Sequence, residues 1–220
     1  MPTAAKGMPE EASPVTLTAE REARLYAGVA EATRFFMGEA DVQRGLEKLV
    51  RLLEEDRIPY AIVGAMALNA YGYRRVTIDV DVLLTREGLA AFKARHLGRG
   101  YAERVPTGNS LRDTEHNVDV DVLISGDYPG DGRPKPVSFP DPATAAVRGV
   151  RLALLPLTRL LELKLASGMT APHRLRDLAD VLEVIRILKL PEEFAAELHP
   201  YVREKYRELW HAARGAEESR

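Results

Sequence analysis

The spacing of apolar residues predicts a chain that alternates between helices and short strands. Six stretches are rich in helix-forming residues or carry apolar residues every three or four positions. These stretches are 42–53, 65–70, 86–97, 157–167, 175–188 and 200–213, and a further helix is predicted from Thr18. Three shorter stretches are continuously apolar or alternate in steps of two, as β-strands do. The strand stretches are 60–63, 77–84 and 118–124.

The order of these elements indicates an α+β fold, with helices first, then a small mixed β-sheet, then more helices. The expected divisions are a disordered tail at 1–17, N-terminal helices at 18–57, an α+β core at 58–150, a C-terminal helical region at 151–213 and a tail at 214–220. Five prolines and two glycines between 128 and 142 predict an ordered connecting loop there.

Composition and charge narrow the classes of function. The chain has no cysteine, which excludes disulfides, thiolate metal sites and cysteine nucleophiles. Its formal net charge of −2 gives no global attraction for nucleic acid or anionic membranes. Neither a signal peptide nor a membrane-spanning run is present, so we expect a cytoplasmic protein with no membrane partner. The charges are unevenly divided, because 142–176 holds one acid against six bases and 58–78 carries only two arginines.

Four aspartates in two of the predicted strands are the main candidates for chemistry. Asp79 and Asp81 are two residues apart, and so are Asp119 and Asp121, so each pair lies on one face of its strand. A lone Asp-x-Asp pair is usually only an exposed strand face, but here the flanking residues are apolar and both strands look central. Carboxylates about 6–7 Å apart at Cα can hold Mg²⁺ jointly. A third carboxylate from the neighbouring strand would complete a two-metal site.

Two further groups adjoin the first aspartate pair. Gly64 and Ala65 form a turn between a strand and a helix, where backbone N–H groups could hold phosphate. Such a turn alone is weak evidence, because most are only turns. Arg75 and Thr77 precede Asp79 with the same period of two, so a strand would point them the same way. Arg75 could neutralise or orient the acids, or could form an ordinary salt bridge with them.

Together these residues resemble the signature of the nucleotidyltransferase superfamily, particularly its minimal and toxin-type members. The signature is an apolar strand, a small-residue turn, a spacer of about a dozen residues and Asp-h-Asp. It stands here as Ile62-Val63-Gly64-Ala65, then 66–77, then Ile78-Asp79-Val80-Asp81-Val82. A second similarity is a helical Leu-x-x-x-Lys-Leu segment followed by Arg-x-Arg-Asp-x-x-Asp, at 160–165 and 174–180. The resemblance covers about 60–187 and implies a polymerase-β-like core.

The resemblance also implies an activity and its residues. The activity would be transfer of a nucleoside monophosphate from an NTP to a hydroxyl acceptor, with Mg²⁺ or Mn²⁺ as cofactor. Asp79, Asp81 and Asp121 would be the metal-binding and catalytic residues. The nucleotide would be bound by Gly64, Ala65, Arg75, Thr77 and Lys164. The acceptor could be tRNA, a protein or a small molecule, and a toxin-type member would have an antitoxin partner.

The sequence departs from this pattern and leaves alternatives open. Ala65 replaces the usual Ser or Gly, Arg176 replaces the usual Lys, and the third carboxylate could be Asp119 instead of Asp121. Lys164 could reach a triphosphate or only extend outward from the edge of the core. We expect Asp177 and Asp180 to pair with the nearby arginines at 174 and 176. An inactive relative that serves as a nucleotide-binding or protein-interaction module and a glycosyltransferase remain competing functions.

Overall fold

A computed structural model describes residues 41–149 and 152–218 of the chain. Its centre is a mixed seven-stranded sheet with the order β3-β4-β5-β2-β1-β7-β6. The strands are β1 (Ala61–Ile62), β2 (Asp79–Leu84), β3 (Tyr101–Glu103), β4 (Ser110–Asp113), β5 (Val118–Ile124), β6 (Val147–Arg148) and β7 (Ala153–Leu154). The long strands β2 and β5 are parallel neighbours, and β1 and β4 pair with them antiparallel on either side.

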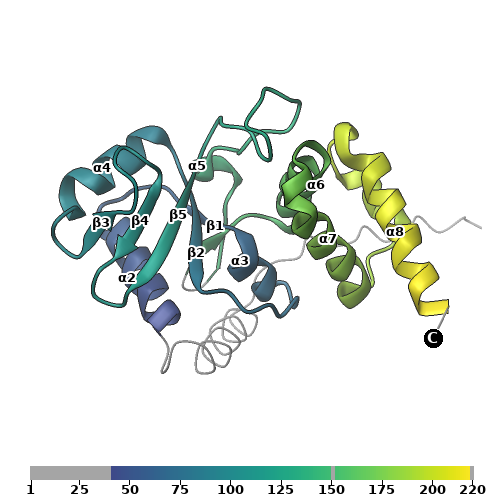
Figure 1. Cartoon of the computed structure of the whole chain (residues 1–220), viewed down its shortest axis with the longest axis horizontal. Helices are drawn as coiled ribbons and strands as arrows, with labels where there is room; N and C mark the ends of the chain where they lie inside the picture. Colours follow the sequence, from purple (N-terminus) through teal and green to yellow (C-terminus); the bar gives the residue numbers. More distant parts are fainter. Residues whose placement is uncertain (1–40, 150–151, 219–220) are drawn as a thin grey trace, which may run out of the picture.

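One face of the sheet packs against two helices. These helices are α2 (Asp41–Glu55) and α4 (Arg86–His96), which lie on the same side of the sheet in Figure 1. The buried residues Val80, Val118 and Val120 point to this side. Gly45 of α2 lies so close to Val118 that a Cβ there would be 3.1 Å from the valine. The alternation along β2 and β5 therefore directs the aspartates to the opposite face.

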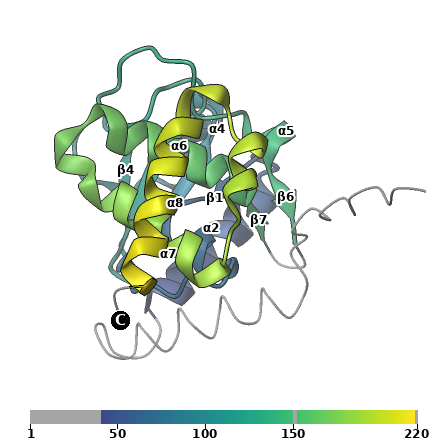
Figure 2. The same ribbon diagram turned by 90° about the vertical axis from the view of Figure 1, so that its right-hand side faces the viewer.

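The helices that follow β1 and β7 in the chain lie on the other side of the molecule. Helix α3 (Gly64–Ala70) follows β1 directly, and α6 (Leu157–Thr170) packs against both α3 and α7 (Leu175–Leu188). Figures 1 and 2 show that α8 (Arg203–Glu218) lies on the outer side of α6 and α7, away from the sheet. The short helices are α5 (Pro142–Ala145), η1 (Pro172–Arg174), η2 (Glu192–Glu197) and η3 (Pro200–Val202).

The structure confirms the mixed α+β architecture and corrects several boundaries. The strand predicted at 118–124 and the helix predicted at 175–188 have the predicted bounds. The strand predicted from Thr77 begins only at Asp79, and the sheet continues past residue 150 into β7. Helix α8 continues to Glu218 instead of ending near 213, and β3, β4, β6 and β7 were not predicted.

Two predictions meet the limits of the described residues. The tail predicted at 1–17 and the helix predicted from Thr18 lie outside them. Within 41–149 and 152–218, no helix has the length and apolar character needed to span a lipid bilayer.

Candidate functional site

A pocket separates the exposed edge of the aspartate face from the C-terminal helices. Its cavity volume is about 150 Å³. The sheet side contributes Gly64 and Asp81, and the helical side contributes Lys164 and Asp177. Apolar walls come from α6, β5 and the loop before α5, through Leu123, Pro129, Phe139, Leu160 and Leu163. The pocket lining therefore combines charged and apolar side chains, which suits a ligand with both kinds of surface.

The parallel pairing of β2 with β5 sets the four aspartates in register. Asp79 lies opposite Asp119, and Asp81 lies opposite Asp121. Residues directly opposite each other on neighbouring strands share a face. The prediction that these aspartates lie on one face is therefore confirmed, and Asp81 has Asp79 along its own strand and Asp121 across from it.

The close approach of Asp81 requires a glycine at position 64. The backbone N–H of Val63 donates to the carbonyl oxygen of Asp81 at 3.0 Å, which brings the turn close to β2. Gly64 has φ of +63°, a left-handed conformation, and a Cβ at this position would lie 1.9 Å from Asp81 Oδ2. Glycine at this turn thus makes room for the carboxylate, whereas the sequence had suggested room for a phosphate. Ala65 is buried in the first turn of α3, and its small side chain fits that position.

The carboxyl group of Asp81 is the least compensated of the four. Burial raises its pKa to about 6, and the neighbouring charges of Asp79 and Asp121 act in the same direction. Lys164 and Arg75 oppose this shift without cancelling it. A partly buried carboxylate that is repelled by two others gains from a bound cation, so the donor set fits Mg²⁺ or Mn²⁺.

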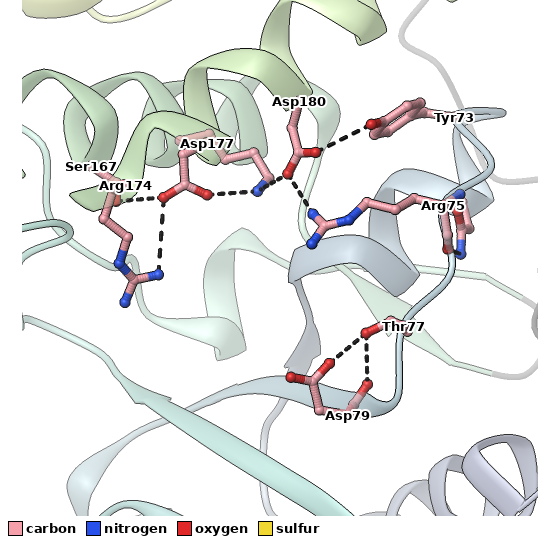
Figure 3. Close-up of polar contacts among 10 residues, drawn as sticks. Tyr73, Arg75, Thr77, Asp79, Ser167, Arg174, Asp177 and Asp180 are labelled. Atoms are coloured by element: carbon pink, nitrogen blue, oxygen red, sulfur yellow. Dashed lines mark hydrogen bonds and ion pairs between the residues drawn. The ribbon is translucent and has the colours of Figure 1, made fainter. Parts of the chain in front are cut away.

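The other three aspartates have separate polar partners. Thr77 donates its hydroxyl to Asp79 (Figure 3), and Ser110 donates its hydroxyl to Asp121 at 2.6 Å. Asp119 pairs with Arg112 and also lies 3.3 Å from Arg104. Because two arginines surround Asp119 while Asp121 keeps a 42% exposed side chain, Asp121 is the better placed third ligand.

Lys164 belongs to an ionic network that joins α6, α7 and the loop before β2. Its ammonium group lies 2.9 Å from Asp177 and 2.7 Å from Asp180. Figure 3 shows the rest of the network: Asp180 also accepts from Tyr73 and Arg75, and Asp177 accepts from Ser167. Burial alone would raise the pKa of Asp177, but Lys164 and Ser167 outweigh it and the pKa is lowered. Lys164 thus faces the pocket with both acids as partners, in place of extending freely outward.

This network corrects the expected position of Arg75. Arg75 and Thr77 precede β2, so neither shares the strand period of Asp79. The guanidinium group of Arg75 contacts Asp180 at 2.6 Å, across the cleft from the strand aspartates. Asp180 was expected to pair with an arginine of its own helix, but its partners come from α6 and the 73–75 loop. Of the expected helix pairs, Arg174 reaches Asp177 at 4.0 Å.

A second acidic group lies on the opposite face of the sheet and was not predicted. In the described part of the chain, three ligand atoms within 4.8 Å of one another occur at Asp113, Glu115 and His116. These residues could hold a metal ion, but the ammonium group of Lys48 lies 2.5 Å from Asp113 and 3.0 Å from Glu115. Burial would raise the pKa of Asp113, yet Lys48 and His116 lower it. A cation therefore already occupies this group.

In the part of the chain that the structure describes, the aspartates on the pocket side of the sheet are not bridged by a buried cation in the way that Lys48 bridges Asp113 and Glu115. Their carboxylates point to different partners, so a bound cation would have to compete with Thr77 and Ser110 for Asp79 and Asp121. Both hydroxyl donors are neutral, and a divalent cation can replace a neutral donor more easily than a buried ammonium group.

Compared with known proteins, the chain matches no protein-family model and no curated protein.

Proposed function

We propose that this chain is a metal-dependent nucleotidyltransferase, which moves a nucleoside monophosphate from an NTP to a hydroxyl acceptor. The observation that carries the proposal is the pocket that Gly64, Asp81 and Lys164 line together, next to the register pairing of Asp81 with Asp121. Carboxylates on one side and an ammonium group on the other suit a metal-bound triphosphate.

The residues would divide the reaction as follows. Asp79, Asp81 and Asp121 would hold Mg²⁺ or Mn²⁺, which neutralises the phosphates and lowers the pKa of the acceptor hydroxyl. Asp121, the exposed member, would take the proton as the acceptor oxygen bonds to the α-phosphorus and the bond to the β-phosphate breaks. Lys164 would then face the pyrophosphate that leaves, with the first amides of α3 at Gly64 and Ala65 nearby. The apolar side chains of the pocket lining would contact the nucleobase.

Several kinds of acceptor are compatible with the proposed reaction, and the labelling experiment below identifies which one is used. Transfer RNA, a protein side chain and a small molecule such as an aminoglycoside are the candidate acceptors that the family resemblance suggests. An antitoxin would be a separate partner, and not an acceptor. The acceptor would approach from the open side of Asp121, where the side chain is 42% exposed.

The test is incubation of the chain with each α-labelled NTP, Mg²⁺ or Mn²⁺, and total cell RNA and protein. A labelled nucleotide sugar serves as the control for glycosyl transfer. We expect either RNA or protein to become labelled, and only when the metal is present. The double variant Asp79→Asn/Asp81→Asn should give no labelling. Binding of NTP without any transfer would instead identify an inactive nucleotide-binding relative.

A further inference from the structure

The connection between β3 and β4 places an arginine beside the carboxylate that we assign as the third metal ligand. Arg104 is the first residue after β3, and its backbone N–H donates to the carbonyl of Ser110 at 3.0 Å. Its guanidinium Nη1 lies 3.3 Å from Asp119 Oδ2 and 3.9 Å from Asp121 Oδ1. The same Oδ1 accepts the hydroxyl hydrogen bond from Ser110. One short turn thus supplies both a neutral donor and a positive charge to this one carboxylate oxygen.

Helix α4 holds this turn in place. The ammonium group of Lys93 donates to the carbonyl of Gly108 at 2.7 Å and lies 2.6 Å from Glu103. Glu103 in turn accepts from the backbone N–H of Thr107 at 3.3 Å. Because both ends of the turn are tied to one lysine, the backbone of Arg104 is fixed next to the carboxylate face while its side chain stays 44% exposed. The guanidinium group can therefore move into solvent without disturbing the turn.

The two arginines near the carboxylates have different relations to the site. Arg112 pairs with Asp119 and Asn117, both at the far end of the aspartate row from the pocket. Arg104 lies between Asp119 and Asp121, within reach of an oxygen that a metal would need. A divalent cation bound at that oxygen would be repelled by the guanidinium group.

We propose that Arg104 is a competitor for the metal at Asp121, a positioning residue that weakens divalent-cation binding until its side chain moves aside. The inference rests on the proposed function, because it requires Asp121 to be a metal ligand. It differs from an ordinary structural salt bridge in what its removal does. Removal of a structural salt bridge lowers stability and leaves metal affinity unchanged, whereas removal of a competing charge tightens metal binding.

The test measures Mn²⁺ binding to the full chain without nucleotide, from the electron paramagnetic resonance signal of free Mn²⁺. Arg104→Gln should bind Mn²⁺ about two- to fivefold more tightly, the scale of one exposed ion pair. Arg104→Lys keeps the charge and should stay close to the natural affinity. Arg99→Gln is the matched control, since it makes the same change in net charge at an exposed position nearby and should leave the affinity unchanged.

Asp81→Asn separates this inference from the proposed function. Mn²⁺ binding that Asp81→Asn abolishes and Arg104→Gln tightens supports both. If Asp81→Asn abolishes binding but Arg104→Gln matches the natural chain or Arg99→Gln, Arg104 is only a structural partner of Asp119 and the inference fails alone. If Mn²⁺ binding does not depend on Asp81, the metal site and the inference fail together.

Discussion

Two acidic groups lie on opposite faces of the same sheet, and they differ in how their charge is compensated. On the face covered by α2, Asp113 is fully buried and Lys48 bridges it to Glu115. On the face toward the pocket, Asp81 is repelled by its neighbours and its pKa is raised to about 6. The first group is complete without a ligand, whereas the second is left with unbalanced negative charge beside a cavity.

This difference shows why a count of acidic residues is a poor guide to a metal site. Asp113, Glu115 and His116 have the closer spacing and would rank first on geometry. Yet binding of a metal there requires expulsion of an ammonium group that already satisfies two carboxylates. We therefore expect the Asp113 group to stabilise the fold and the Asp81 group to bind the ligand.

Replacement of Asp113 should give the largest effect on stability. Asp113→Asn leaves Lys48 buried beside one exposed partner, Glu115, and the loss of one member of a buried pair costs about 3–5 kcal/mol. Urea unfolding measures this loss. The turnover of the molecules that stay folded should be unchanged, and a variant of natural stability would mean that Asp113 is not part of a structural pair.

Replacement of Asp81 should have the opposite pattern. Asp81→Asn should reduce nucleotidyl transfer by roughly 100- to 1000-fold, the scale of removing one group that stabilises developing charge. Its stability at neutral pH should match or exceed that of the natural chain, because a buried repulsion is removed. Initial rates with the NTP found by the labelling experiment are the measurement, and near-natural turnover would exclude the proposed mechanism.

The two bridging lysines provide a matched pair for the next test. Lys48 bridges Asp113 and Glu115, and Lys164 bridges Asp177 and Asp180, but only Lys164 lines the pocket. Both lysine-to-methionine variants should lose stability, since each leaves two acids with fewer partners. Lys164→Met should in addition weaken NTP use by about 10- to 150-fold, the value of one charge-assisted contact of ~1.5–3 kcal/mol.

A loss of stability could by itself weaken NTP use, and comparison of the two variants separates this effect from a direct loss of nucleotide binding. Thermal melting and NTP titration are carried out on the same preparations of Lys48→Met and Lys164→Met. If both variants melt earlier by similar amounts but bind NTP equally well, Lys164 is a structural bridge like Lys48 and has no part in nucleotide binding.

The sequence predicted the aspartate face well because that face follows from local periodicity. Strand β5 has its predicted bounds, and the in-phase aspartates of β2 and β5 share one face as expected. The family resemblance also assigned Lys164 and Gly64 to one nucleotide site, and both residues line the pocket. These features depend on spacing within an element or on motifs that the chain itself carries.

The rest depends on contacts between residues far apart in the chain. Strands β3 and β4 have three and four residues with mixed polarity, so they carry no clear alternation. They exist because β4 pairs with β5 and β3 pairs with β4. Asp113 lies in such a strand, and its partner Lys48 is 65 residues away. The partner of Arg75, Asp180, is 105 residues away. Periodicity within a strand carries no information about such partners.

The pH dependence of stability offers a smaller test of whether the charge of Asp81, unlike that of Asp113, is left uncompensated. The pKa of Asp81 is raised in the folded chain, so its carboxylate destabilises the fold once it loses its proton. That cost is absent below the unfolded pKa near 4 and complete above about pH 6. Asp81→Asn should therefore gain stability relative to the natural chain across this window, by up to about 3 kcal/mol. Urea unfolding between pH 4 and 8 measures the gain. If the difference in stability between Asp81→Asn and the natural chain is constant with pH, the pKa of Asp81 is not raised in the folded chain.

The smallest expected effect concerns Asp119, and it tests the choice between the two aspartates of β5. Arg112 and Arg104 both contact Asp119, whereas Ser110 is the closest partner of Asp121. A carboxylate held by two arginines offers little unbalanced charge to a metal. Asp119→Asn should thus lower turnover only about fivefold, through a slight displacement of Arg104 and Arg112, and should cost at most about 1 kcal/mol of stability. Asp121 lies two residues further along the same strand, and Asp121→Asn should abolish nucleotidyl transfer as fully as Asp81→Asn does. Initial rates and Mn²⁺ affinities of the two variants, measured side by side, give the ranking. The reverse ranking would move the third ligand by two residues, toward Arg112 and away from the pocket, and would require both arginines to leave Asp119 before a metal could bind.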